Sequence, residues 1–472
     1  MKQFRYIVPV LAVAIASCNK ELGKLPENAK VDGNTIIDQK TAKVALNGVY
    51  YRFANVSADR QNTTRWGINE VNPGYFSGQL GYGYGETDPE KNIYNIGDDI
   101  FWTYSYNIIN SANGVIGSVE ALPDNMFTGD GKKNVLSEAR FLRAYAHFKL
   151  LSYYGMWWDL NSDKGALLRD KLVTLGNIAK KRSTVADSYK FILDDLDYAI
   201  ANGPDLTDNV YATKWAAMLL KMRVLLSHGQ AADFPVVISL ADQITGSGKF
   251  QMEGNLMDLF RTKGLSSKEV ILGVRPQQNQ ESYYYNYSRQ YWPGASSLYS
   301  ASLLFKTALQ NDPRATWMIG SVNPNRADSW YFTKYIAQGS TPSQITETGY
   351  AMRFSEVYLL KAEAIARSAG GNLTAAKTII KDVMAHSQVT DFTQVDNAVT
   401  ADDVQKQVYF EIVRNLTGED GMEWLALLRL PFATVQQLRP TINNKIQYIM
   451  PVPHNELLNN PEFGDQNPGY QR

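Results

Sequence analysis

Two stretches of this sequence gather the side chains that proteins use to hold sugars. The first spans residues 60–84, and the second spans residues 275–292, which read RPQQNQESYYYNYSRQYW. Flat aromatic rings cover the apolar C–H faces of a sugar, and amides, carboxylates or guanidinium groups hydrogen-bond its hydroxyls. Because both stretches offer rings beside amides and arginines, they are our candidate ligand-binding regions.

The second stretch places tyrosines at every other position. If it is extended, Tyr283, Tyr285, Tyr287 and Tyr291 project on one side. Asn286, Ser288 and Gln290 on the other side would need hydrogen-bond partners in a core, so we expect an exposed ribbon or loop. The candidate ligand-binding residues here are Asn279, Tyr283, Tyr285, Tyr287, Arg289, Tyr291 and Trp292.

The first stretch mixes aromatic residues with asparagine and glycine. Its candidate ligand-binding residues are Trp66, Asn69, Tyr75, Tyr82 and Tyr84, the last two set between glycines. Two alternatives stay open for both stretches. The rings could pack against the scaffold or a partner protein, or they could belong to polar-aromatic loops of low complexity.

Enzymatic motifs are absent from the sequence. The four histidines are scattered, and neither an HExxH nor a cysteine-based zinc pattern occurs. No GxSxG elbow is present, and residues 81–86 fail as a dinucleotide loop because Glu86 replaces the third glycine. A glycosidase carboxylate pair stays open because its spacing is spatial. We expect no catalytic residues and no cofactor.

A calcium loop is a weaker possibility. Asp159, Asn161 and Asp163 alternate as oxygen ligands would, with Asp170 further on. The sixth position of such a loop needs glycine, and here it is Lys164. We therefore interpret this segment as a turn and expect no metal.

A buried helix over residues 135–154 would organise the scaffold. Apolar residues recur at helical spacing on two adjoining stripes, and the polar residues Arg140, Arg143 and His147 share a narrow strip. Its alanines let neighbouring helices approach closely. Gly155 is placed to end it as a C′ residue.

Further helices are predicted on both sides of this one. They cover residues 40–53, 100–122, 184–202, 213–228, 352–369 and 374–386. Pairs joined by short Gly or Pro turns are similar to tetratricopeptide-type hairpins. Residues 57–97 and 247–349 are predicted to be largely irregular, with one strand at 270–274, and the tail 446–472 is predicted to be non-helical.

The N-terminus is typical of an exported protein. Basic residues precede a short apolar run, and residues 15–18 read IASC, which is similar to a lipobox. We predict a signal peptide at 1–17, lipidation of Cys18, and a tether over 18–39. The alternative is a plain signal peptide with an incidental cysteine. The run is shorter than the roughly 20 apolar residues of a membrane span.

The overall composition argues against nucleic acid as a partner. The 47 basic and 47 acidic residues cancel, so no strong field favours polyanions. Tyrosine is abundant at 28 residues, with 9 tryptophans, which suits wet contact surfaces.

Several motifs together resemble the SusD/RagB family of surface lipoproteins. Residues 139–144 read ARFLRA and run on to Tyr-Tyr-Gly at 153–155, and residues 352–358 read MRFSEVY and run on to AEA at 362–364. The closing signature is YIMPVP at 448–453, NNP at 459–461 and QNPGY at 466–470. The family's proline after the Tyr-Gly pair is replaced by Met156-Trp157-Trp158, and residues 409–414, YFEIVR, keep part of a family charge pattern.

The resemblance implies a mainly α fold in which tetratricopeptide-like hairpins scaffold an irregular, loop-rich ligand-binding half. It divides the chain into a helical region at 40–230, with the insertion 57–97, and a second region at 231–472. It implies a non-catalytic lipoprotein on the outer face of the outer membrane, held by its N-terminal lipid. Its partner would be a SusC-type TonB-dependent transporter, and its ligand a nutrient glycan, with ligand aromatics in loops of the two stretches above. Peptides as ligands, a surface glycoside hydrolase and a bare interaction scaffold are the alternatives.

Overall fold

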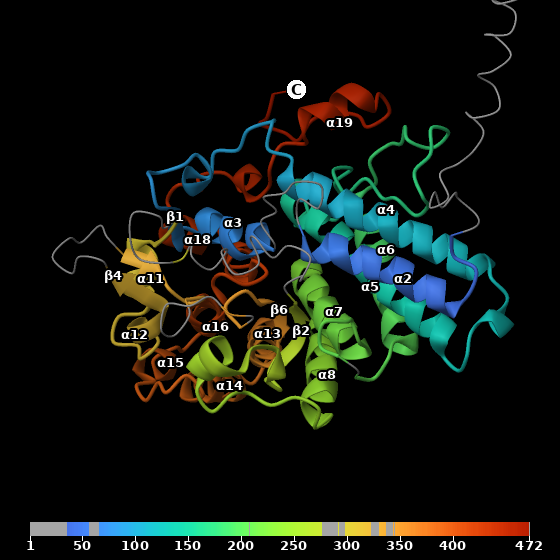
Figure 1. The fold of residues 1–472 in the computed structure, drawn as a ribbon. Helices are drawn as coiled ribbons and strands as arrows, with labels where there is room; N and C mark the ends of the chain where they lie inside the picture. The colour runs from blue at the N-terminus through green and yellow to red at the C-terminus, as the bar shows by residue number, and fades with distance from the viewer. Residues whose placement is uncertain are drawn as a thin grey trace, which may run out of the picture.

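The computed structural model describes residues 35–55, 66–206, 208–275, 291, 298–321, 330–336, 343 and 345–471. Within them the fold is mainly helical, as predicted. Figure 1 shows α2, α4, α5 and α6 side by side, with α7 and α8 leading on to the helices, strands and loops of the second half.

The predicted long helices are confirmed, with ends that shift by a few residues. Their observed bounds, together with α8 and α16, are α2 (Gln39–Ala54), α4 (Ile100–Ala121), α5 (Gly131–Tyr154), α6 (Val185–Asn202), α7 (Lys214–His228), α8 (Asp233–Gly246), α13 (Phe354–Arg367), α14 (Leu373–Ala385) and α16 (Ala401–Leu416). Asp38, Thr184 and Thr213 cap three of them by accepting the backbone N–H three residues on. Consecutive helices pack as pairs, including α4 with α5, α7 with α8, and α13 with α14.

Helix α5 is buried over most of its surface. It packs against α2, α4 and α6, and Ala139, Ala144 and Ala146 have no exposed surface. Small side chains at these positions allow the close helix contacts that the sequence predicted.

Gly155 ends α5, but not as a left-handed C′ residue. Its φ is −104°, an ordinary extended value. Glycine is needed for space instead, since a Cβ there would lie 2.9 Å from the carbonyl oxygen of Leu151 and 3.2 Å from that of Lys164.

The polar strip of α5 is largely buried. Arg143 Nε and Nη2 donate to both carboxylate oxygens of Asp195, at 2.7 and 2.8 Å, and Nη1 donates to Asn113. His147 is fully buried; its Nε2 accepts the Arg169 backbone N–H, and its Nδ1 lies 3.0 Å from the Arg143 carbonyl oxygen. Burial and the neighbouring Arg143 charge lower the pKa of His147 to about 3.

The prediction that residues 57–97 lack helix is wrong for α3 (Gly67–Ser77). Nearly every residue of this helix is buried, so it shows no amphipathic period, and it contains Pro73 and Gly74, which disfavour helix. Tertiary packing overrides these local preferences.

The second half contains more regular structure than predicted. The strand β2 (Val270–Val274) is confirmed, and it pairs antiparallel with β6 (Gly349–Arg353). A four-stranded sheet has the order β1-β3-β5-β4, with β1 (Leu80–Tyr82), β3 (Tyr299–Ala301), β4 (Ile319–Ser321) and β5 (Trp330–Phe332). Its neighbouring strands are antiparallel and only three residues long, too short to carry a sequence period.

Short helical segments complete the described chain. They are η1 (Pro89–Lys91), η2 (Asp124–Met126), α9 (Leu256–Asp258), η3 (Leu259–Lys263), η4 (Gly264–Ser266), α11 (Leu303–Ala308), α12 (Ala315–Met318), α15 (Thr393–Asp396), α17 (Met422–Leu428), α18 (Phe432–Leu438), η7 (Lys445–Tyr448) and α19 (His454–Asn459). Thus the tail is not wholly non-helical, because η7 and α19 lie within it.

Buried ion pairs tie α7 to the second half. Arg223 on α7 contacts Glu356 on α13 and Asp420. Within the second half, Arg353 contacts Glu269 and Glu419. All of these side chains are buried. A buried guanidinium without its carboxylate would be strongly destabilising, so the Arg223 pairs hold α7 against the second half.

Candidate ligand-binding site

The structure corrects part of the predicted ligand set in the first stretch. Trp66 and Asn69 have no exposed surface, and both donate hydrogen bonds to the hydroxyl of Tyr104, at 3.2 and 3.3 Å. Tyr75 is only 9% exposed. These three side chains belong to the core, so the prediction that they contact ligand is wrong.

Tyr291 is a second correction. It has no exposed surface, and its ring packs on Tyr299 and Tyr335 at centroid distances of 4.8 and 5.2 Å. Its hydroxyl donates to Glu70 at 3.0 Å. Tyr291 therefore anchors the second stretch to α3 and cannot reach a ligand.

Tyr82 and Tyr84 remain on the surface, 37% and 60% exposed. Their ring centroids are 5.6 Å apart. Tyr82 lies opposite Tyr299 in the β1–β3 pair, so this sheet joins the first stretch to the chain that follows the second. The remaining candidates, Asn279, Tyr283, Tyr285, Tyr287, Arg289 and Trp292, and the lipidation site Cys18, lie outside the described residues.

A pocket of about 310 Å³ opens where α2, the segment before α7 and the end of β2 meet. This volume is at the lower end of the roughly 300–1,000 Å³ of small-molecule sites. Its lining residues are Asn47, Tyr50, Tyr51, Phe53, Ala54, Val210, Tyr211, Gly273, Val274 and Arg275. We call it the α2 pocket.

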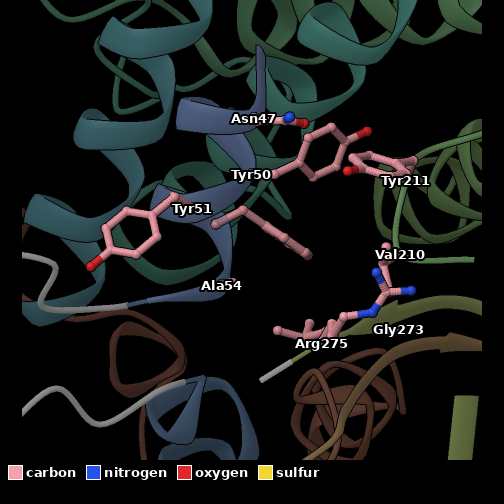
Figure 2. Close-up of a pocket in the computed structure, with 10 residues that line it drawn as sticks. Asn47, Tyr50, Tyr51, Ala54, Val210, Tyr211, Gly273 and Arg275 are labelled. Carbon is pink, nitrogen blue, oxygen red and sulfur yellow. The ribbon is translucent and has the colours of Figure 1, made fainter. Parts of the chain in front are cut away.

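Aromatic rings form its walls. Figure 2 shows the rings of Tyr50 and Tyr211 close together, while the ring of Tyr51 points away from them on the other side of α2. The rings of Tyr50 and Tyr211 meet edge to face, with centroids 5.0 Å apart at 87°. Such mutual packing holds the rings in place before any ligand arrives.

Hydrogen bonds fix the position of Tyr50. Its hydroxyl donates to Glu138 at 2.7 Å and accepts the backbone N–H of Ala212 at 2.7 Å. Burial raises the pKa of Glu138 to about 7, although the bond from Tyr50 favours the carboxylate. These contacts link the aromatic wall to α5.

Polar groups enter the same pocket from two sides. The amide of Asn47 is exposed on α2, and Arg275 reaches in from the end of β2 (Figure 2). Arg275 forms an ion pair with Asp208, with 2.5 Å between Nη2 and Oδ2. Because a guanidinium has five N–H donors, this pair orients Arg275 and leaves donors for ligand hydroxyls.

The second predicted stretch begins at this pocket, because its first residue, Arg275, lines it. Residues 56–65 and 276–290 lie outside the described residues.

Sequence reasoning missed the α2 pocket itself. Only the apolar residues of the predicted 40–53 helix were used to predict it, and Asn47 and Tyr51 lie on the other face of that helix. Tyr211 lies in a connection between helices. An asparagine and a tyrosine four residues apart, and so on one helix face, were the available signal.

The lining of the α2 pocket supplies rings, an amide and a guanidinium. None of its ten residues is Asp, Glu, His, Cys or Lys. Within the described ranges, no three His, Cys, Asp or Glu side chains gather as a metal site would require. In the turn after α5, the carboxylate of Asp159 accepts the backbone N–H of Asn161.

The described chain is thus built of helical hairpins, with an aromatic, polar-rimmed pocket where α2 meets the end of β2. Two family models match the chain in tandem. One is described as starch-binding associating with outer membrane and matches residues 22–226, and the other is the SusD family and matches residues 219–429.

Relatives and solved structures agree with these matches. A SusD-like protein of Bacteroides ovatus is 23% identical over 58% of this chain and 50% of its own length, so the chain spans half of that relative. A SusD-like protein of Formosa agariphila is 21% identical over the full length of both.

Three solved structures share the fold. A SusD superfamily protein of Bacteroides thetaiotaomicron has a TM-score of 0.73, 20% identity, and coverage of 92% of this chain and 100% of its own. NanU of B. fragilis has a TM-score of 0.73, 18% identity, and coverage of 95% and 100%. A laminarin-binding SusD-like protein has a TM-score of 0.71, 17% identity, and coverage of 92% and 100%. The chain belongs to the SusD/RagB family.

Proposed function

We propose that this chain is a cell-surface lipoprotein that binds a nutrient glycan and delivers it to a SusC-type TonB-dependent outer-membrane transporter. The observation that carries the proposal is the α2 pocket, which combines tyrosine rings with an oriented guanidinium and an exposed amide. Rings suit the C–H faces of a sugar, and the polar groups suit its hydroxyls.

The proposed ligand surface has three parts. The first is the α2 pocket, with Asn47, Tyr51, Tyr211 and Arg275 as its ligand contacts. The second is the exposed pair Tyr82 and Tyr84. The third is the set of sequence candidates Asn279, Tyr283, Tyr285, Tyr287, Arg289 and Trp292, on the stretch that follows Arg275.

A glycan suits this surface better than a peptide. Extended peptides are held largely by main-chain pairing along a strand edge, whereas the α2 pocket offers rings and side-chain donors. A family model described as starch-binding and a neighbour described as laminarin-binding support the same ligand class.

Membrane attachment is proposed to depend on a lipid on Cys18. No described helix is long and apolar enough to cross a membrane. Lys20 and Glu21 follow Cys18 after Asn19, in keeping with the short charged signals of surface-exported lipoproteins.

A glycan panel tests the function. In affinity electrophoresis, one class of neutral or acidic polysaccharide in the gel should slow the migration of the purified protein. The protein should bind no peptide of a matched panel, and it should release no new reducing ends from the polysaccharide. Binding to peptides only would overturn the ligand class. Turnover that is lost on substituting a single carboxylate would show a hydrolase instead.

A further inference from the structure

A second pocket lies against the three residues that replace the usual proline after the Tyr-Gly pair. It measures about 240 Å³ and shares no residue with the α2 pocket. Its lining residues are Met156, Trp158, Asn444, Lys445, Ile446, Pro468 and Gly469. We call it the Trp158 pocket.

Trp158 is held rigidly as its aromatic wall. The half-buried indole meets Tyr448 edge-on, with centroids 5.4 Å apart at 76°, and meets Trp157 at 5.7 Å and 87°. Trp157 in turn lies nearly parallel to Tyr448, at 18°. Two perpendicular neighbours fix the indole, so little side-chain entropy is lost when a ligand stacks on it.

Hydrogen bonds between side chains and the backbone fix the opposite rim of the pocket. Asn444 accepts the N–H of Ile446 at 3.0 Å, and Gln447 accepts the N–H of Asn443 and of Asn444 at 2.9 and 3.1 Å. Tyr470 donates to the Ile449 carbonyl oxygen at 2.7 Å. Although η7 is short, this capping places Lys445 beside the pocket.

The polar groups of this rim can donate but carry no negative charge. None of the seven lining residues is acidic, and Lys445 is exposed. In the described part of the chain its ammonium has no carboxylate within ion-pair distance. The α2 pocket differs, because there Asp208 balances Arg275.

Two buried polar groups sit in the ring cluster behind Trp158. The indole N–H of Trp157 and the hydroxyl of Tyr448 have no hydrogen-bond partner among the described residues. Buried donors of this kind are normally satisfied by protein or water. Neither residue lines the Trp158 pocket itself.

We propose that the Trp158 pocket binds a sugar ring carrying a carboxylate or sulfate, with the ring stacked on Trp158 and the anionic group on Lys445. Trp gives the ring a flat apolar face, and an uncompensated ammonium favours an anion over a neutral hydroxyl. The inference rests on the proposed glycan-binding function for its ligand class but concerns a separate site.

Fluorine NMR on protein labelled with 5-fluorotryptophan tests this inference. The Trp158 resonance is assigned with Trp158→Phe, and methyl β-D-glucuronide and methyl β-D-glucoside are the probes. We expect the glucuronide to shift this resonance saturably and to bind more tightly than the glucoside. Lys445→Met should weaken the glucuronide about tenfold, and Lys249→Met, an exposed lysine elsewhere, should not.

Each outcome decides one part of the inference. Equal affinity for both probes, or no effect of Lys445→Met, would overturn the claim that the pocket prefers an anionic sugar. If neither probe shifts the Trp158 resonance, the claim that this pocket binds a sugar ring is overturned. The Tyr51→Ala variant, which removes a wall of the α2 pocket, should leave the Trp158 response intact, so failure of either site is seen separately.

Discussion

The hydroxyl of Tyr291 donates a 3.0 Å hydrogen bond to the carboxylate of Glu70, joining residues 221 positions apart. Both side chains are fully buried. The bond fastens Tyr291 of the second aromatic stretch to α3, which lies within the first stretch, so part of each stretch belongs to the core.

Tyr291→Phe should therefore destabilise the fold and leave glycan affinity unchanged. Removing a hydrogen bond to a buried carboxylate costs about 1–3 kcal/mol, which urea unfolding measures directly. Tyr84→Phe, on an exposed ring, is the matched control and should change stability little. If Tyr291→Phe lowers glycan affinity while its free energy of unfolding stays unchanged, Tyr291 contacts the ligand after all.

The scaffold could be predicted from the sequence because its helices are long and repeat their apolar residues at 3.6-residue spacing. Helix α3 could not, since it is buried on nearly all sides and carries Pro73. The four-stranded sheet could not be predicted either, because its strands are too short to show a period and β1 pairs with β3 more than 200 positions away.

The candidate site was predictable only by region. Tyrosine suits both a core with a hydrogen-bond partner and a wet surface, so its identity does not separate Tyr291 from Tyr84. The α2 pocket combines residues from three segments, and no local pattern brings Tyr51, Tyr211 and Arg275 together.

Acid should destabilise the protein partly through His147. Its pKa is about 3 in the fold against an ordinary 6.5, so between these values the unfolded chain binds more protons and stability falls as pH is lowered. The contribution is about 1.4 kcal/mol for each pH unit in this window. His147→Gln removes the titration, so its unfolding free energy should change less between pH 6.5 and 4.5 than that of the wild type. Parallel pH dependence in the two proteins would contradict this assignment.

Gly155→Ala should lower stability, because its methyl group would press on the carbonyl oxygens of Leu151 and Lys164. Overpacking of this kind costs about 1–3 kcal/mol. Gly117 lies within α4 with no heavy atom within 4 Å of an added Cβ. Gly117→Ala should thus stabilise by roughly 0.5–1 kcal/mol. Thermal melting of the two variants should show a lower melting temperature for Gly155→Ala and a higher one for Gly117→Ala. Equal shifts in one direction would contradict the steric explanation.

Cys18→Ser should release the protein from the outer membrane fraction, because the proposed lipid is the anchor. Fractionation in high salt, in cells lacking the proposed SusC-type transporter, makes this measurement. A variant that still sediments with membranes under those conditions would contradict lipid anchoring.

The most direct test of the central claim is calorimetric titration of the retained glycan into wild type, Tyr51→Ala and Arg275→Ala. Each ring or oriented donor lost should weaken binding about tenfold or more, since 1.4 kcal/mol corresponds to one decade. Lys249→Ala breaks a comparable exposed ion pair with Asp205 and is the control for Arg275. The account predicts weakened binding in both pocket variants at unchanged melting temperature. Wild-type affinity in both would contradict glycan binding at the α2 pocket.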